Sequence, residues 1–443
     1  MFNYSRWTLP LAILVVIVAG LWALFTCLEG KKPSVRLGQD IAFIGTRTDL
    51  TLACSDTGQG LRTIQARILQ KGQRRLVADL AFPERGLHHT NAVITIDPGA
   101  LKLEEGNADL EITAVDYSLR KNCTTLSLPV TIDRTPPQIF PVSSSHYINP
   151  GGSCLTVYRL SESVAENGVL VDETFFPAYK VSEEETPLFA VLFALPPHQP
   201  GKNMKIGIVA RDFAGNEMFS SIPHHIRVKK FRNDTMRIGK SFLENKMPEF
   251  RHLCPAVKED ASLRDLFVYV NETLRKKNLE EVIGICAQSR PQQLWEKPFL
   301  RMSNAATMAT FGDKRTYVFE GKKISSSTHL GIDLASTVNA PIEASNSGIV
   351  VYCGNIGIYG NTVIIDHGLG LFSFYAHLSF ISVEKGESVT RGQPIGKSGM
   401  SGLAGGDHLH FGIFVGKRFV NPQEWWDPHW IKDNITKKID LAP

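Results

Sequence analysis

The sequence predicts a mainly β protein with an N-terminal transmembrane helix, two immunoglobulin-like β-sandwich domains, a short helical connector and a C-terminal all-β domain. Three observations support this prediction: a charge-free apolar segment near the N-terminus, apolar residues at alternate positions up to about residue 230, and glycine-rich β segments near the C-terminus. We expect the anchor at 1–33, the sandwiches at 34–135 and 136–230, the connector at 231–300 and the last domain at 301–430.

Composition favours several globular domains. The chain has 443 residues, of which 43% are hydrophobic and 21% are charged, which excludes a disordered chain and a multi-pass membrane protein. The net charge of +4 comes without a long run of Lys or Arg. We therefore expect no nucleic-acid partner, whereas an anionic wall or membrane surface is compatible with this charge.

The first element is the apolar segment from Leu9 to Leu28, which contains no charged residue. A helix rises about 1.5 Å per residue, so this segment is long enough for a hydrocarbon core of about 30 Å. A cleaved signal peptide is the competing interpretation, but its apolar part is usually shorter, about 7–15 residues. Lipidation at Cys27 is a minor alternative, because Phe25 and Thr26 fit a lipoprotein signal poorly. The flanking charges leave the orientation open.

The two sandwiches are predicted from alternation with a period of two residues. Apolar side chains recur in this way at Leu50, Leu52 and Cys54, and again at Leu110, Ile112 and Ala114. The pattern repeats about 100 residues later, where Ile206, Ile208 and Ala210 lead into Asp212, much as the earlier strand leads into Asp116. The paired prolines Pro136 and Pro137 mark the linker between the two domains. Cys54 and Cys123 lie in one predicted domain, and the sequence leaves open whether they form a disulfide.

The connector is predicted from a change to helical spacing. Leu263, Leu266, Phe267, Val270 and Leu274 fall on one face of a helix that Ser262 can cap with Asp265. A second helix is expected over 279–287. Packing against the next domain is favoured over a regulatory lid.

The chemistry is concentrated near the C-terminus. Among 13 histidines, three groups stand out: His329-Leu-Gly-Ile-Asp333, Tyr375-Ala-His377-Leu, and Asp407-His408-Leu-His410-Phe-Gly. On a strand, His408 and His410 point to one face, while Leu409 points to the other. Two imidazoles and a carboxylate leave one tetrahedral position of a zinc ion open, as in catalytic sites. The seven cysteines have no metal-binding spacing, so any metal must be held by His and carboxylate groups.

These motifs, in this order, resemble the lysostaphin/LytM-type zinc metallopeptidases over about residues 305–425. The resemblance implies an all-β LytM-type peptidase domain that binds Zn2+ through His329, Asp333 and His410. It further implies that His377 and His408 are catalytic, and that a zinc-activated water attacks a peptide bond of peptidoglycan. His367, at a turn after an apolar strand, is interpreted as structural.

The expected function is that of a membrane-anchored zinc metalloendopeptidase that hydrolyses peptide cross-links of peptidoglycan. The expected partners are peptidoglycan stem peptides and, through the N-terminal helix, the membrane. The expected place is the inner (cytoplasmic) membrane, with the large domain facing the periplasm or the cell exterior. One alternative is a non-catalytic LytM-type regulator or scaffold of other wall hydrolases, and another is a zinc peptidase acting on proteins. The bond that is cut, autoinhibition and the oligomeric state are left open.

Overall fold

The computed structural model describes residues 8–27, 30–143, 146–182, 187–198 and 204–440. Strands dominate these residues, so the prediction of a mainly β protein is confirmed. The chain forms two compact units, Met1–Pro136 with Arg211–Glu217, and Pro137–Ala210 with Met218–Pro443. The boundary between Pro136 and Pro137 falls at the paired prolines. The finer five-part division stays a prediction.

The apolar N-terminal segment forms helix α1, Thr8–Cys27. Leu28, the last residue of the expected span, lies outside the described residues. Within the part of the chain that the structure describes, no helix combines the length and apolar character needed to cross a membrane. The expected transmembrane helix is therefore not supported.

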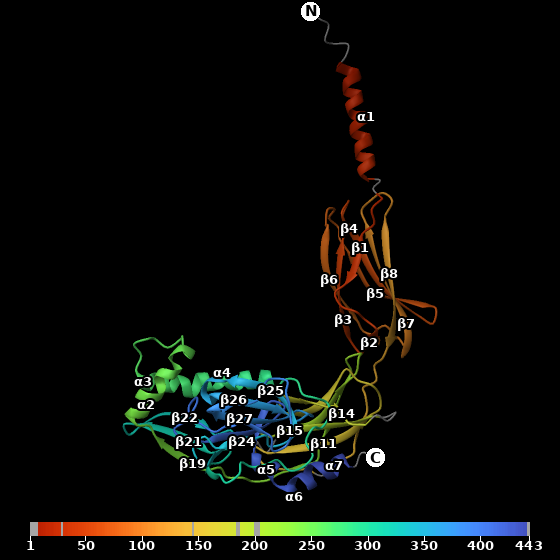
Figure 1. The fold of residues 1–443 in the computed structure, drawn as a ribbon. Coiled ribbons are helices and arrows are strands. Elements are labelled where there is room, and N and C mark those ends of the chain that lie inside the picture. The colour runs from red at the N-terminus through yellow and green to blue at the C-terminus, as the bar shows by residue number, and fades with distance from the viewer. Residues whose placement is uncertain (1–7, 28–29, 144–145, 183–186, 199–203, 441–443) are drawn as a thin grey trace, which may run out of the picture. The chain divides into compact units, whose positions relative to one another are not determined.

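The first compact unit contains two sheets, with strand orders β1-β3-β6 and β2-β8-β7-β4-β5 (Figure 1). All neighbouring strands in them are antiparallel except β2 and β8, which are parallel. Its strands are β1 Ser34–Leu37, β2 Phe43–Ile44, β3 Thr48–Ser55, β4 Leu61–Gln70, β5 Gln73–Ala81, β6 His89–Ile96, β7 Gly106–Asp116 and β8 Cys123–Ile132. Alternate residues of β3 and β7, including Leu50 and Leu110, are buried in one core, which confirms the period-two prediction. The immunoglobulin-like assignment is not confirmed. Cys54 and Cys123 are free thiols.

The second unit begins with short strands in three small sheets, ordered β14-β15-β11-β9, β13-β12-β16-β17 and β10-β18. Their bounds are β9 Ile139–Pro141, β10 His146–Ile148, β11 Ser153–Leu160, β12 Glu166–Val171, β13 Thr174–Pro177, β14 Tyr179–Lys180, β15 Leu188–Ala194, β16 Ile206–Arg211, β17 Glu217–Ser221 and β18 His224–Ile226. Buried residues of these strands belong to the same hydrophobic core as the C-terminal strands. The carboxylate of Glu424 accepts hydrogen bonds from Asn149 and from the backbone of Ser153, which joins the two parts.

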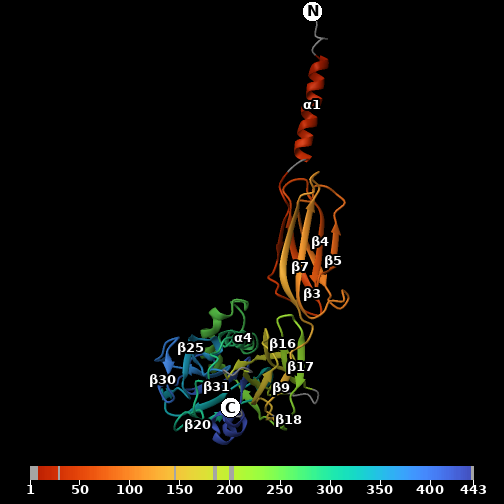
Figure 2. The same ribbon diagram turned by 90° about the vertical axis from the view of Figure 1, so that its right-hand side faces the viewer.

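The predicted connector is helical and also contains a strand that its sequence did not predict. The elements are β19 Asn233–Arg237, α2 Lys240–Lys246, the 3-10 helix η2 Met247–Leu253, α3 Leu263–Tyr269, the π-helix η3 Val270–Leu274 and α4 Arg275–Ile285. Ser262 caps α3 by accepting a hydrogen bond from Asp265 N, as expected. Leu266 and Phe267 face the common core. In both views, α2–α4 lie on the side of the strands opposite α5–α7 (Figures 1 and 2).

The C-terminal region is built on a sheet ordered β20-β23-β31-β27-β26-β25-β29, with smaller sheets β19-β21-β22 and β24-β30-β28 beside it. The strands are β20 Ala306–Ala309, β21 Lys314–Phe319, β22 Lys322–Thr328, β23 Ile332–Ala335, β24 Pro341–Glu343, β25 Gly348–Asn355, β26 Asn361–Asp366, β27 Leu371–Leu378, β28 Phe380–Ile381, β29 Ser388–Val389, β30 Pro394–Lys397, β31 Leu409–Val415 and β32 Arg418–Val420. The remaining helices are η4 Gly357–Tyr359, α5 Pro422–Trp426, α6 Pro428–Ile431, η5 Lys432–Thr436 and α7 Lys437–Ile439.

The connector is bonded into this region. Asn278 of α4 accepts a hydrogen bond from Ile358 N, at 3.0 Å, and Asn271 of η3 donates to Ser325 Oγ, at 2.7 Å. A Cβ added at Gly357 would lie 2.4 Å from Asn278 Oδ1, so this close approach requires glycine. The connector thus packs on the C-terminal strands, as the favoured interpretation expected.

Candidate metal centre and catalytic cleft

Three neighbouring strands of the large sheet bring the predicted residues together. Asp333 of β23 pairs in register with His410 of β31, and His410 pairs on its other side with Ala376 of β27. His377 follows Ala376 on β27 and departs from the strand conformation with a φ of 62°, and its ring centroid lies 5.8 Å from that of His410. His408 precedes β31 and forms an isolated bridge with Gly399. The strand register therefore brings together Asp333 and His410, which are 77 positions apart in sequence.

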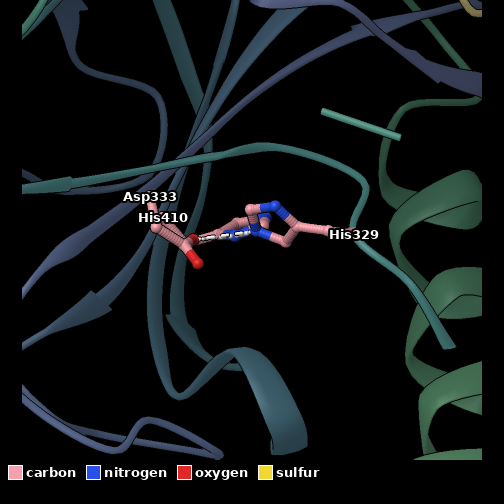
Figure 3. A group of neighbouring side chains, drawn as sticks. All are labelled: His329, Asp333 and His410. Atoms are coloured by element: carbon pink, nitrogen blue, oxygen red, sulfur yellow. Dashed lines mark hydrogen bonds and ion pairs between the residues drawn. The ribbon is translucent and has the colours of Figure 1, made fainter. Parts of the chain in front are cut away.

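His329, Asp333 and His410 form a compact buried cluster, in which His329 reaches the other two from the opposite side (Figure 3). Asp333 Oδ1 lies 2.8 Å from His329 Nε2 and 2.9 Å from His410 Nδ1, and the two nitrogens are 3.0 Å apart. One ligand atom from each residue therefore points to a single position.

Gly331 allows the close packing of this cluster. A Cβ added there would lie 2.6 Å from both Cε1 and Nε2 of the His410 ring. Any larger residue would push that imidazole away from Asp333. Steric exclusion therefore explains why the His-x-Gly-x-Asp motif has glycine at position 331.

The three ligand atoms of the cluster are arranged so that they could bind a metal ion. His329 Nδ1 lies 2.9 Å from the carbonyl oxygen of Thr310, which can only accept, so Nδ1 carries the proton. Nε2 of His329 then faces a carboxylate oxygen at 2.8 Å, and either a proton or a metal ion between these two atoms satisfies both. His410 Nδ1 points at the same position, while its Nε2 is buried without a hydrogen-bond partner in the described residues. Ligands of a tetrahedral zinc ion lie about 3.3 Å apart, so a few tenths of an ångström of relaxation would accommodate the ion.

Electrostatics favour an ionised Asp333 carboxylate and a neutral His410 imidazole, which are the forms that bind metal. Burial opposes the charge on Asp333, but His329 and His410 outweigh it and hold the Asp333 pKa well below its usual range. Burial lowers the pKa of His410 to about 4. The second carboxylate oxygen of Asp333 accepts a hydrogen bond from Arg315 Nη2 at 2.9 Å.

His377 and His408 lie beside the cluster, with ring centroids 4.8 Å apart. His377 Nδ1 is 2.8 Å from Ser401 O, and His408 Nδ1 is 2.8 Å from Gly406 O. Because carbonyl oxygens only accept, both Nδ1 atoms carry protons, and Nε2 is the atom at which each ring binds or releases a second proton. Burial, followed by the neighbouring His408 and His410, holds the pKa of His377 well below its usual range. Both rings are therefore equipped to accept a proton at Nε2.

His367 has different surroundings. It is fully buried, and its ring nitrogens lie 2.7 Å from Ser347 O and 2.7 Å from Ser373 Oγ. Burial lowers its pKa to about 4. Both ring nitrogens are thus engaged in hydrogen bonds, as expected of a structural histidine.

A cleft of about 640 Å³ opens onto the cluster. All five predicted site residues line it, and so do residues that the sequence motifs did not reveal: Met236 and Arg237 of β19, Phe242 of α2, Phe267 of α3, Arg275 of α4, and Arg315 and Tyr317 of β21. β19 is placed there by parallel pairing with β21, in which Asp234 lies opposite Arg315. No local spacing signal links these residues to the histidine motifs, so only the tertiary structure could reveal them.

Fold and site together define a class: a β domain whose sheet carries a three-ligand metal-binding cluster, with free imidazoles beside it, in an open cleft. This arrangement is typical of metal-dependent hydrolases.

Comparisons with known proteins identify the domain. Residues 327–422 match Peptidase family M23. A segment of 93 residues is 44% identical to peptidoglycan DD-endopeptidase ShyA of Vibrio cholerae and covers 21% of this chain and 22% of ShyA. A segment of 94 residues is 40% identical to DD-carboxypeptidase/endopeptidase Mpg of Neisseria gonorrhoeae and covers 21% of this chain and 22% of Mpg. The solved catalytic domain of lysostaphin from Staphylococcus simulans is 28% identical, with 28% of this chain and 94% of that chain covered and a TM-score of 0.24.

The C-terminal region of the chain therefore contains a domain of Peptidase family M23. This confirms the resemblance to lysostaphin/LytM-type peptidases that the motifs indicated. This chain is matched over about a fifth of the length of ShyA and of Mpg.

Proposed function

We propose that the protein is a zinc metalloendopeptidase that hydrolyses peptide cross-links of peptidoglycan. The observation that carries the proposal is the convergence of His329 Nε2, Asp333 Oδ1 and His410 Nδ1 on one position in an open cleft. These three residues would hold the ion and leave the cleft side free for substrate. When bound, zinc supplies Lewis acidity and a water molecule of lowered pKa.

His377 and His408 are assigned the proton transfers. Each is held by an Nδ1 hydrogen bond to a backbone carbonyl, so its Nε2 is the atom that accepts or returns a proton. After protonation, the same Nε2–H can donate a hydrogen bond to the oxygen on which negative charge develops. The two rings are neighbours, so one can transfer the proton while the other donates the hydrogen bond to the oxygen.

The substrate class is supported by the relatives. ShyA is named a peptidoglycan DD-endopeptidase and Mpg a DD-carboxypeptidase/endopeptidase, and they are similar to this chain over segments of 93 and 94 residues. We extend that substrate class to this chain. The cleft is also bordered by Arg237 and Arg275, whose positive charges suit the carboxylates of stem peptides.

The proposed place of action is outside the cytoplasmic membrane, in the periplasm or at the cell exterior, because peptidoglycan lies there. Protease added to spheroplasts should digest the large domain, and digestion only after lysis would contradict this location. Anchoring through Leu9–Leu28 has no support among the described residues and stays a prediction from the sequence.

The test is incubation of the purified protein with isolated sacculi, followed by identification of the released fragments by mass spectrometry. Hydrolysis of cross-links, lost on removal of metal, is the expected result. A folded, zinc-loaded protein that leaves sacculi intact but cuts a protein would favour the protein-substrate alternative. One that cuts neither, yet increases the activity of an added wall hydrolase, would favour a regulator or scaffold.

A further inference from the structure

We propose that Arg315 is a positioning residue, which orients the Asp333 carboxylate so that one oxygen is presented to the ion shared with His329 and His410. This inference rests on the proposed function, because it requires metal binding at that cluster. Arg315 belongs to β21 and precedes the segment 327–422 that matches the peptidase family. Arg315 would therefore act on the metal-binding cluster from outside the matched segment.

The two oxygens of Asp333 have different partners. Oδ1 faces the ring nitrogens of His329 and His410, at 2.8 and 2.9 Å. Oδ2 accepts the hydrogen bond from Arg315 Nη2, at 2.9 Å. Rotation of the carboxylate would break the bond at Oδ2, so Arg315 keeps Oδ1 directed at the position on which the ligand atoms converge.

The guanidinium is itself held in place. The Arg315 side chain is 19% exposed and that of Asp333 is 12% exposed, so water competes little for either partner. β21 is the middle strand of the sheet β19-β21-β22, which fixes the backbone of Arg315 on both sides. The position of this side chain thus depends on β19, a strand of the connector.

A second carboxylate lies on the neighbouring strand. Asp234 of β19 is opposite Arg315 in the parallel pair, and Cα partners in register present their side chains to the same face. Asp234 Oδ1, however, lies 2.6 Å from Arg232 Nε. Asp234 thus has its ion pair with Arg232, and the hydrogen bond from Arg315 goes to Asp333.

Two effects of opposite sign act on metal affinity. The positive charge of Arg315 repels a nearby cation, whereas its hydrogen bond restricts the carboxylate to the ligating orientation. Hydrogen-bond partners of metal ligands typically raise metal affinity by about 10–100-fold. We therefore expect the orienting effect to dominate.

The test measures zinc affinity in the full chain by competition with a chromophoric chelator. Arg315→Met should bind zinc about 10–100-fold more weakly than the wild type. Arg315→Lys should recover part of the loss, because an ammonium can donate to Oδ2 but lacks the planar geometry of guanidinium. Arg275→Met is the matched control, since Arg275 lines the same cleft but bonds to Asn271. Its zinc affinity should equal that of the wild type.

Cobalt substitution gives a readout that a merely structural role would not change. Without Arg315, Oδ2 is free to become an additional ligand, and a higher coordination number weakens the visible absorption of Co2+. The Arg315→Met spectrum should weaken, while the Arg275→Met spectrum should match the wild type. If Arg315→Met fails to fold, Arg315→Lys carries the test, with an affinity below that of the wild type as the supporting result.

Wild-type zinc affinity and an unchanged cobalt spectrum in folded Arg315→Met would overturn the inference, as would tighter binding. Such results would leave the proposed function intact, provided that His329→Ala loses zinc. If the wild-type protein itself binds no zinc, the proposed function fails and the inference fails with it.

Discussion

Replacement of His377 by Asn should separate catalysis from metal binding. His377 has a left-handed backbone conformation, with φ of 62°, which Asn adopts more readily than most residues. The Asn amide can also donate a hydrogen bond toward Ser401 O, the partner of His377 Nδ1. The variant should therefore keep the local backbone and lose only the proton-accepting Nε2.

The expected loss of turnover is about 10²–10⁴-fold, the range for removal of an acid–base group, which corresponds to about 2.7–5.5 kcal/mol of activation free energy. Zinc binding should persist, because His377 is not among the three residues whose ligand atoms converge. His408→Ala should behave in the same way. With ring centroids 4.8 Å apart, the two histidines serve one transition state, so the double variant should lose much less than the product of the single losses.

The assay is the rate of cleavage of a cross-linked muropeptide per folded, zinc-loaded enzyme, with zinc measured by chelator competition. His367→Ala is the control, because that ring is buried away from solvent and bonds to Ser347 and Ser373. It should lower stability and leave turnover per loaded enzyme unchanged. The catalytic assignment would be refuted if His367→Ala abolished cleavage in a folded, loaded enzyme while His377→Asn cleaved at the wild-type rate.

Three further predictions follow from the same structure. Replacing any one of the three ligand residues by Ala should reduce zinc content from one ion per chain to near zero by elemental analysis, and full occupancy in all three variants would disprove the ligand set. Burial lowers the pKa of His367 to about 4 from 6.5. On acidification, His367 is therefore protonated in the unfolded chain at a higher pH than in the folded chain. The free energy of unfolding should therefore fall by up to roughly 3 kcal/mol between pH 6.5 and 4 because of this histidine. In urea unfolding measured across this pH range, a His367→Gln variant should lack this contribution to the pH dependence. A chain truncated to begin at Pro298 lacks β9–β19 and α2–α4, and buried residues of these elements, including Phe193 and Phe267, belong to the common core. Its urea midpoint should therefore lie below that of a chain beginning at Pro137, and equal midpoints would contradict this.

The sequence was informative wherever structure is set by local spacing. Leu50 and Leu110 were assigned to buried strand faces because a strand alternates its side chains, and Ser262 was assigned as a helix cap because the cap and Asp265 are three residues apart. The five candidate site residues were found for a similar reason, since each lies in a short motif. The cleft contains all five.

Long-range pairing accounts for what the sequence could not predict. β19 was missed because a five-residue polar strand has no apolar alternation, and its parallel pairing with β21 is a tertiary feature. The contact between Glu424 and Ser153 joins residues 271 positions apart, so no local pattern could reveal that the early strands of the second unit share a core with the C-terminal strands. Arg315 was missed for the same reason, as its role depends on where Asp333 lies.

Titration of zinc into metal-stripped protein, with cleavage of a cross-linked muropeptide followed at each step, tests the central claim most directly. We expect no cleavage by the stripped protein, a linear rise in rate with added zinc, and a plateau at one ion per chain. Full cleavage by the stripped protein, or none at any zinc loading of the folded chain, would contradict the account.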